Sequence, residues 1–231
     1  MGAFWNKGSV AFGDVAGMAS GAIELRQFVV SPFSTNCYAV ICAGQAMVVD
    51  PGAEGVRIAE ALADVDVRLV VATHGHADHV GGVAALVAAT GARFAMAEQD
   101  VELARHARRN HAFGIEYDAD APEPDELLAP GDVTGVGEAR FSVTATPGHT
   151  PGGITLVGTD AASGLAFVGD TLFAGSAGRT DLAGGDPVVL MASLGHLARE
   201  LAPQTHVLCG HGDDTTMSWE LGHNPYLRAA R

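Results

Sequence analysis

The ten residues THGHADHVGG, at positions 73–82, concentrate side chains that bind metal ions. In an extended chain, residues two apart point to the same side, so His74 and His76 can serve one ion. Asp78 and His79 are adjacent and reach a common point only if the chain turns there, as it would if a helix began with Asp78 as its N-cap. The segment therefore predicts two ligand pairs directed at two neighbouring points, as in sites whose two ions lie about 3.5–4 Å apart.

Three more candidate ligands lie in glycine-rich loops that follow predicted strands: His149 in TPGHTPGG, Asp170 in VGDTLF and His211 in CGHG. The carboxylate of Asp170 can offer one oxygen to each ion, which makes it a candidate bridge. Two ions that share a carboxylate lower the pKa of a water between them towards neutrality. The resulting hydroxide, beside a Lewis acid, is suited to attack on a carbonyl carbon.

The elements that must position these ligands follow from the hydrophobic pattern. Strand patterns occupy residues 23–31, 35–42, 45–50, 67–73, 93–97, 140–145, 152–160, 164–168 and 205–209, and helix patterns occupy 56–65, 80–91, 98–110 and 187–201. Residues 1–22 are expected to form a flexible tail, 23–231 a single metallo-hydrolase domain, and 111–138 loops and short strands. Four of the strands end just before a ligand loop, so we expect those loops to converge on one edge of the fold.

Composition limits the possible partners. The chain has 231 residues, of which 48% are hydrophobic, and a formal net charge of −14. A surface this negative disfavours nucleic acid and anionic membranes as partners and leaves a small molecule as the expected substrate. The sequence contains no apolar run long enough to span a bilayer and no signal-peptide pattern. The three cysteines, Cys37, Cys42 and Cys209, are too few for a disulfide framework, so we expect reduced thiols in a cytoplasmic protein.

The ordered motifs THGHADHVGG, TPGHTPGG, FVGDTLFAGSAGRTDL and LCGHG, preceded by VVDPG at residues 48–52, resemble the metallo-β-lactamase superfamily over about residues 23–227. The resemblance implies an α/β fold in the form of a four-layer αββα sandwich. It also implies that Asp50 supports the metal-binding loops. The implied ligands are His74, His76 and His149 for one ion, Asp78, His79 and His211 for the other, and Asp170 as the bridge.

Within that superfamily, GDTLFAGSAGRTDL and the closing NPYL are similar to the glyoxalase II-like group in its shorter bacterial form. This implies hydrolysis of small acyl-thioesters of the hydroxyacyl-glutathione type by a metal-bridging hydroxide, with Asp78 or Asp170 orienting the nucleophile. The cofactors would be two divalent metal ions, with zinc favoured and iron or manganese as alternatives. Asp170 stands where metallo-β-lactamases typically carry Cys or Ser, which disfavours a β-lactam substrate.

The resemblance is incomplete at the C-terminus, because longer glyoxalase II enzymes add a helical segment that binds glutathione, and only a short segment follows His211 here. The thiol must then be recognised in another way, or it is not glutathione. Arg179, Tyr226 and Arg228 are possible substrate contacts. Each of the three is also compatible with a structural or solvated role.

Two alternative functions remain open. One is a mono-iron persulfide dioxygenase of the same superfamily, in which His74, His149 and Asp170 would hold the iron; the dipeptide Thr171-Leu172 favours the hydrolase. The other is a non-catalytic metal-binding scaffold. Such degenerate relatives usually lose a ligand, and all seven candidates are present here.

Overall fold

The computed structural model describes residues 5–10, 23–108, 117 and 119–230. The apolar run predicted as a buried strand forms β5 (Asp66–Val71). Leu69 and Val71 of β5 point into one core cluster and Val70 into another, so the strand is buried on both faces. An uninterrupted apolar run, rather than an alternating one, is the pattern expected of such a strand.

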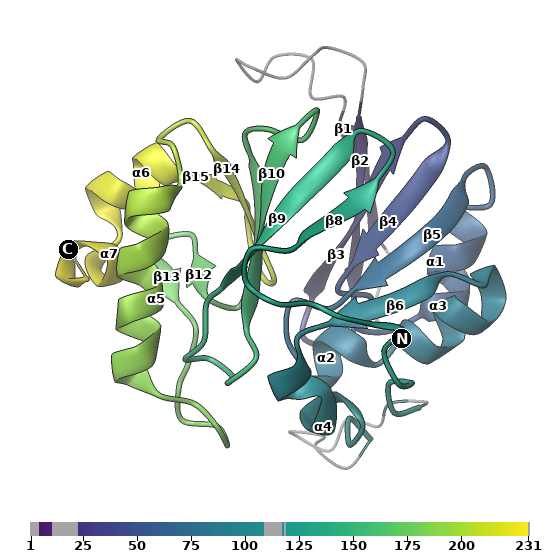
Figure 1. Ribbon diagram of the computed structural model, residues 1–231, viewed down its shortest axis with the longest axis horizontal. Coiled ribbons are helices and arrows are strands. Elements are labelled where there is room, and N and C mark those ends of the chain that lie inside the picture. Colours follow the sequence, from purple (N-terminus) through teal and green to yellow (C-terminus); the bar gives the residue numbers. More distant parts are fainter. Residues whose placement is uncertain (1–4, 11–22, 109–116, 118, 231) are drawn as a thin grey trace.

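Two β-sheets pack face to face (Figure 1). The first follows the order β1 to β7 and consists of β1 (Trp5–Val10), β2 (Glu24–Val30), β3 (Thr35–Cys42), β4 (Gln45–Val49), β5, β6 (Arg93–Met96) and β7 (Glu126–Leu127). The second has the order β15-β14-β11-β10-β9-β8 and consists of β8 (Val133–Val136), β9 (Ala139–Ala145), β10 (Ile154–Asp160), β11 (Leu165–Gly169), β14 (His206–Cys209) and β15 (Thr215–Thr216). A separate hairpin pairs β12 (Leu172–Phe173) with β13 (Ser176–Ala177).

Helices cover the outer face of each sheet. On the first sheet, α1 (Gly55–Ala61) and α3 (Val83–Thr90) pack against each other, and Ile58 and Leu86 join the core beneath them. On the second sheet, α5 (Pro187–Glu200) contributes Leu194 and Leu197 to a core that extends to α6 (Met217–His223) and α7 (Pro225–Ala229). A third cluster, which includes Phe141 and Phe167, fills the space between the sheets. The predicted four-layer αββα sandwich is confirmed.

Some elements differ from their expected extents. Trp5–Val10 forms a strand that pairs antiparallel with β2, where a flexible tail was expected; residues 11–22 of that tail lie outside the described residues. The helix expected over 98–110 is a short 3-10 helix, η1 (Glu98–Asp100), followed by α4 (Val101–Ala104). Within 111–138, β7 and β8 are the predicted short strands, while 111–116 and 118 are not described. The single-domain organisation of 23–231 stays a prediction.

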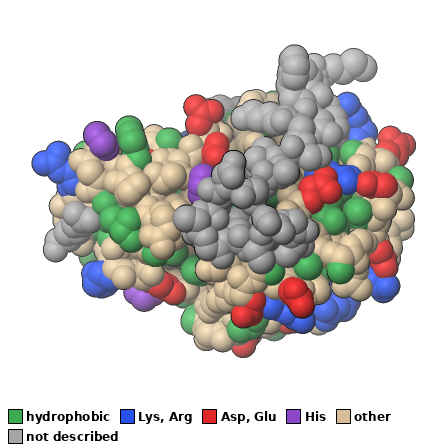
Figure 2. Space-filling view, turned by 90° about the horizontal axis from the view of Figure 1, so that it is seen from above, with side chains coloured by type: hydrophobic (Ala, Val, Ile, Leu, Met, Phe, Trp, Pro, Cys, Tyr) green, Lys and Arg blue, Asp and Glu red, His purple; other side chains and the backbone are tan. Residues whose placement is uncertain are grey.

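The surface charges and the state of the cysteines can be compared with what the composition predicted. Figure 2 shows acidic and basic side chains interspersed over one face of the molecule. The three cysteines are buried and free, so the predicted absence of disulfides is confirmed. Among the described residues, no helix is long and apolar enough to cross a membrane.

Candidate metal centre

Four loops bring the candidate ligands to one edge of the sandwich, as predicted. The loop after β5 runs into the single-turn helix α2 (Ala77–Val80) and carries four of the candidates. The other three ligands follow β9, β11 and β14, which all belong to the second sheet. The candidates therefore come from both sheets and meet where the sheets face each other.

His74, His76 and His149 form a first trio, whose ligand atoms all lie within 4.8 Å of one another. The Nδ1 atom of His76 is 2.9 Å from Nε2 of His149, and the ring of His74 is 4.9 Å from each of the other two rings. Nε2 of His74 is buried and has no hydrogen-bond partner. Three converging imidazoles, one with an unpartnered nitrogen, are a donor set that suits one divalent cation.

Asp78, His79 and His211 form a second trio within the same 4.8 Å limit. Nε2 of His211 is 3.3 Å from Oδ2 of Asp78 and 3.2 Å from Nε2 of His79. The chain turns here as expected, because Asp78 and His79 lie within α2. The expected N-cap role of Asp78 is wrong, since the N-cap position is His76 and Asp78 lies in the first helical turn.

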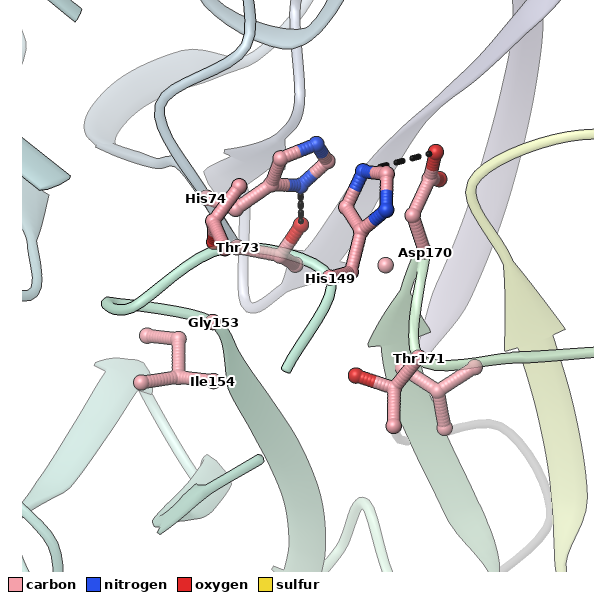
Figure 3. A pocket seen from close by; sticks show the side chains of 10 residues that line it. Thr73, His74, His149, Gly153, Ile154, Asp170 and Thr171 are labelled. Carbon is pink, nitrogen blue, oxygen red and sulfur yellow. Dashed lines mark hydrogen bonds and ion pairs between the residues drawn. The ribbon is translucent and has the colours of Figure 1, made fainter. Parts of the chain in front are cut away.

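Asp170 lies between the two trios. Figure 3 shows its carboxylate beside the ring of His149. Its Oδ2 atom is 3.5 Å from Nε2 of both His149 and His211, and its Oδ1 atom is 3.3 Å from Nε2 of His79. Oδ1 is buried and makes no hydrogen bond. A carboxylate with one nitrogen of the first trio and two of the second around it occupies the position expected of a bridge. The histidine and aspartate groups thus fit a dinuclear site.

The two trios differ in their electrostatics. Burial lowers the pKa of His74 well below its usual value and lowers that of His76 to about 4, so both rings are neutral at pH 7. Burial also acts to lower the pKa of His79 and His211, but neighbouring carboxylates, Asp170 foremost, raise both, that of His211 to about 9. Neutral imidazole is the form that binds metals. His74 and His76 are therefore in the form that binds a cation, whereas His79 and His211 must release a proton to bind one.

Several histidines are oriented through the ring nitrogen that faces away from the site. Nδ1 of His149 donates to the carbonyl of Arg179 at 2.7 Å, and Nδ1 of His211 donates to the carbonyl of Phe33 at 3.1 Å. Nδ1 of His79 lies 3.0 Å from Oδ2 of Asp50. Such bonds fix the tautomer and leave Nε2 free to bind a metal.

Asp50 has the supporting position that the sequence predicted. Its two oxygens accept from the backbone N–H of Thr73 at 2.7 Å and from the Thr73 hydroxyl at 2.6 Å, in addition to the contact with His79. Two residues later, a side chain at Gly52 would overlap the backbone carbonyl of Asp78, so the VVDPG motif brings two backbones into close contact. Gly210 likewise leaves room for the side chain of Asp170, because a Cβ at position 210 would overlap its Oδ1 atom.

A cavity of about 470 Å³ opens onto both trios. Its walls are partly apolar, and its lining residues outside the ligand set are Phe33, Ala77, Tyr117, Phe173, Ser176, Ala177, Arg179 and Leu182. Sequence reasoning missed Tyr117, which is only 7% exposed and whose buried hydroxyl has no hydrogen-bond partner among the described residues. Nothing in the acidic segment around it signalled a place in the site.

Of the three possible substrate contacts, only Arg179 lines this cavity, and its guanidinium makes two hydrogen bonds of 2.7 Å to Asp181. Tyr226 and Arg228 lie on α7, which packs against α5, α6 and β13. Neither side chain is among the residues that line the cavity, so the structure does not support them as contacts. Sequence reasoning also missed Asp100, whose buried carboxylate touches two ligand loops.

Comparisons with known proteins agree with this geometry. A family model described as "Metallo-beta-lactamase superfamily" matches residues 30–212. The hydroxyacylglutathione hydrolase GloC of Haemophilus influenzae is 32% identical over 209 residues, which cover 87% of this chain and 96% of GloC.

Solved structures with related sequences show the same fold. The BLEG-1 B3 metallo-beta-lactamase superposes with a TM-score of 0.81 at 30% identity, covering 88% of this chain and 99% of BLEG-1. TTHA1623 in a di-iron-bound form gives 0.77 at 34% identity, with 86% and 98% covered. ETHE1 from Myxococcus xanthus gives 0.68 at 30% identity, with 87% and 83% covered. These proteins share the fold, but they are not all named for the same chemistry.

Proposed function

This chain belongs to the metallo-beta-lactamase superfamily, whose members are mostly metal-dependent hydrolases, and we propose that it hydrolyses small acyl-thioesters of the hydroxyacyl-glutathione type. The observation that carries the proposal is the position of Asp170 between two ligand trios on a cavity of about 470 Å³. The hydroxyacylglutathione hydrolase GloC, similar over nearly its whole length, supports the choice of substrate class and the assignment to the short glyoxalase II-like group.

The proposed ligands are the seven side chains of the two trios and Asp170. His74, His76 and His149 would hold one divalent cation, and Asp78, His79 and His211 the other, with Asp170 shared. Zinc is the favoured ion, and iron or manganese are alternatives that accept the same ligands. When bound, such a pair supplies Lewis acidity and makes water a better nucleophile at neutral pH.

The chain's own groups have separate roles in the proposed reaction. Water attacks the thioester carbonyl carbon, the C–S bond breaks, and the products are a carboxylic acid and a thiol. Asp78 and Asp170 both line the cavity, where their carboxylates can orient the attacking water. Phe33, Phe173 and Leu182 provide apolar walls that keep bulk water from the acyl group. A thiolate is a good leaving group, so the reaction needs no strong general acid.

The alternative is the mono-iron persulfide dioxygenase, with His74, His149 and Asp170 as iron ligands. Nε2 of His149 lies 3.5 Å from Oδ2 of Asp170, so two of these three side chains are close together. The similarity to TTHA1623 in its di-iron-bound form and to ETHE1 fits this alternative as well as the hydrolase. The second trio distinguishes them, because a single iron leaves Asp78, His79 and His211 without a ligand role.

The proposal includes a small-molecule substrate, no nucleic-acid or membrane partner, and a cytoplasmic location. The net charge of −14 and the interspersed surface charges of Figure 2 support the first two points. The buried free cysteines support a reducing compartment.

One set of assays tests the proposed function. The purified protein, loaded with Zn²⁺ or Fe²⁺, is given a 2-hydroxyacyl-glutathione thioester, a lactone, a phosphoester and a β-lactam, and oxygen uptake is followed with glutathione persulfide. We expect two metal ions per chain and preferred hydrolysis of the thioester. One iron per chain with rapid oxygen consumption would establish the dioxygenase instead, and turnover of none of these substrates would favour the non-catalytic scaffold.

A further inference from the structure

Asp100, the last residue of η1, joins two of the ligand loops through one buried carboxylate. The residue is 1% exposed. Its Oδ2 atom accepts from the backbone N–H of Gly75 at 2.9 Å, and its Oδ1 atom accepts from the backbone N–H of Gly152 at 2.6 Å. The loop after β5 and the loop after β9 are thus hydrogen-bonded to the same side chain, although they leave different sheets.

The two amides belong to the loops that carry the first trio. Gly75 lies between His74 and His76, and Gly152 follows three residues after His149. Asp100 therefore holds the backbone next to His74 and His76, and it holds the loop of His149 three residues beyond that ligand. The second trio has other supports, because His79 contacts Asp50 and His211 donates to the carbonyl of Phe33.

The glycines at 75 and 152 allow this close contact. A Cβ at Gly152 would lie 2.6–2.7 Å from Cγ, Cβ and N of Asp100, and a Cβ at Gly75 would lie 2.6 Å from the carbonyl oxygen of Asp100. Neither glycine has a positive φ. The requirement for glycine at both positions therefore comes from contact with Asp100 and not from the backbone conformation.

We propose that Asp100 is a positioning residue that sets the spacing of His74, His76 and His149, and so controls the affinity of the first cation site separately from the second. The inference rests on the proposed two-metal function. Both oxygens of Asp100 act as acceptors, which an isosteric amide cannot reproduce. Asparagine at this position would turn one acceptor into an NH₂ group that faces a backbone N–H. One of the two loops would lose its hydrogen bond and move away from the other.

The test compares Asp100→Asn with Asp125→Asn in the full chain by competitive Zn²⁺ titration against a chromophoric chelator. Asp125 is the control for loss of a carboxylate acceptor away from the ligands, because this exposed residue accepts one backbone N–H, from Phe94 at 2.8 Å, near the start of β6. We expect wild type and Asp125→Asn to bind two Zn²⁺ alike. In Asp100→Asn one of the two sites should weaken by about 10-fold or more, in the range seen when a group that orients metal ligands is removed.

Other outcomes separate the inference from the proposed function. Two Zn²⁺ sites of wild-type affinity in Asp100→Asn would overturn the inference alone, even if the variant melts at a lower temperature. A wild-type protein that binds no Zn²⁺ would overturn the proposed function and the inference together. A merely structural role for Asp100 predicts a lower melting temperature of the metal-free protein with unchanged Zn²⁺ affinity.

Hydrogen exchange in the wild-type protein decides the matter if Asp100→Asn does not fold. Two amides bonded to one carboxylate should become exposed in the same opening event, so the protection factors of Gly75 and Gly152 should agree within about threefold. Addition of Zn²⁺ should raise both together. Exchange of the Gly152 amide about 100-fold faster than that of Gly75 would show that the loops open independently and would overturn the proposal.

Discussion

Replacement of Asp50 by asparagine tests how the protein determines which nitrogen of each histidine is free to bind a metal. Oδ2 of Asp50 accepts the hydroxyl proton of Thr73 and lies 3.0 Å from Nδ1 of His79. The Thr73 oxygen is in turn 3.2 Å from Nδ1 of His74. Because the Thr73 hydroxyl donates its hydrogen bond to Asp50, the Thr73 oxygen accepts from Nδ1 of His74. His74 and His79 therefore both carry their proton on Nδ1 and leave Nε2 free to bind a metal.

In Asp50→Asn this arrangement reverses. The amide oxygen of asparagine can still accept from the backbone N–H of Thr73, which directs the NH₂ group towards the Thr73 hydroxyl and His79. His79 must then accept at Nδ1 and carry its proton on Nε2. The Thr73 hydroxyl must then donate to Nδ1 of His74, so His74 also carries its proton on Nε2. Each trio therefore has one histidine whose metal-binding nitrogen is protonated.

The size of the effect follows from the hydrogen bonds lost. A hydrogen bond to a charged group contributes about 1.5–3 kcal/mol, and about 1.4 kcal/mol corresponds to a tenfold change in a binding constant. The Zn²⁺ affinity of each of the two sites should therefore fall by about 10- to 150-fold in Asp50→Asn. Thr73→Val removes the hydroxyl that connects Asp50 to His74 but keeps the contact between Asp50 and His79, so it should weaken the first site and leave the second nearly unchanged.

Competitive Zn²⁺ titration with a chromophoric chelator measures both sites, and Asp125→Asn again serves as the control for loss of one carboxylate. The expected pattern is two weakened sites in Asp50→Asn and one in Thr73→Val. The reasoning is refuted if Asp50→Asn, folded by circular dichroism, binds two Zn²⁺ within about threefold of the wild-type affinities, because that is below the weakest loss of about tenfold.

Four further outcomes are expected. Gly210→Ala places a Cβ over Oδ1 of Asp170 and should abolish binding of the second Zn²⁺ in equilibrium dialysis; retention of two ions would contradict the assigned position of Asp170. In chelator-treated protein the pKa of His211 is raised to about 9, so the folded state binds this proton more tightly than the unfolded state does. Protonated His211 therefore stabilises the folded protein below pH 6.5, and this stabilisation is lost as the pH rises through 9. Urea unfolding of wild type and His211→Gln between pH 6 and 10 should show the difference between them shrinking, and a constant difference would speak against it. Free Zn²⁺ at 100 times its dissociation constant should raise the free energy of unfolding by about 2.7 kcal/mol for each site, and a chelator should reverse the gain. Arg179→Gln should raise the KM for a glutathione thioester about 10-fold with little change in kcat, as expected for lost uniform binding; an unchanged KM would exclude Arg179 as a contact.

The fold was predictable where burial dictates the residue pattern. The run at 67–73 had to be a strand covered on both faces, and the ligands after β5, β9, β11 and β14 had to follow strand ends. The extent of the helix expected over 98–110 was less predictable, because helical propensity does not reveal that it begins as the 3-10 helix η1 or that the carboxylate of Asp100 accepts from two distant loops. Likewise β1 was missed, since scattered glycines in the first twenty residues hide its pairing with β2.

The candidate site was predictable where its residues are clustered in the chain, and less so where they are brought together by folding. The spacing of His74, His76, Asp78 and His79 indicated ligands directly. Asp100 and Tyr117 gave no such signal, because their contacts join segments far apart in sequence. Tyr226 was singled out by residue type alone, and the packing of α7 places it 45% exposed and outside the cavity lining.

The origin of the ligands has a mechanical consequence. His74, His76, Asp78 and His79 extend from the first sheet, and the other three ligands extend from the second, while the contacts between the sheets are otherwise largely apolar. Cations held by all seven side chains would cross-link the two sheets of the sandwich. Any motion that separated the two sheets would then also separate the metal ligands of the reaction centre.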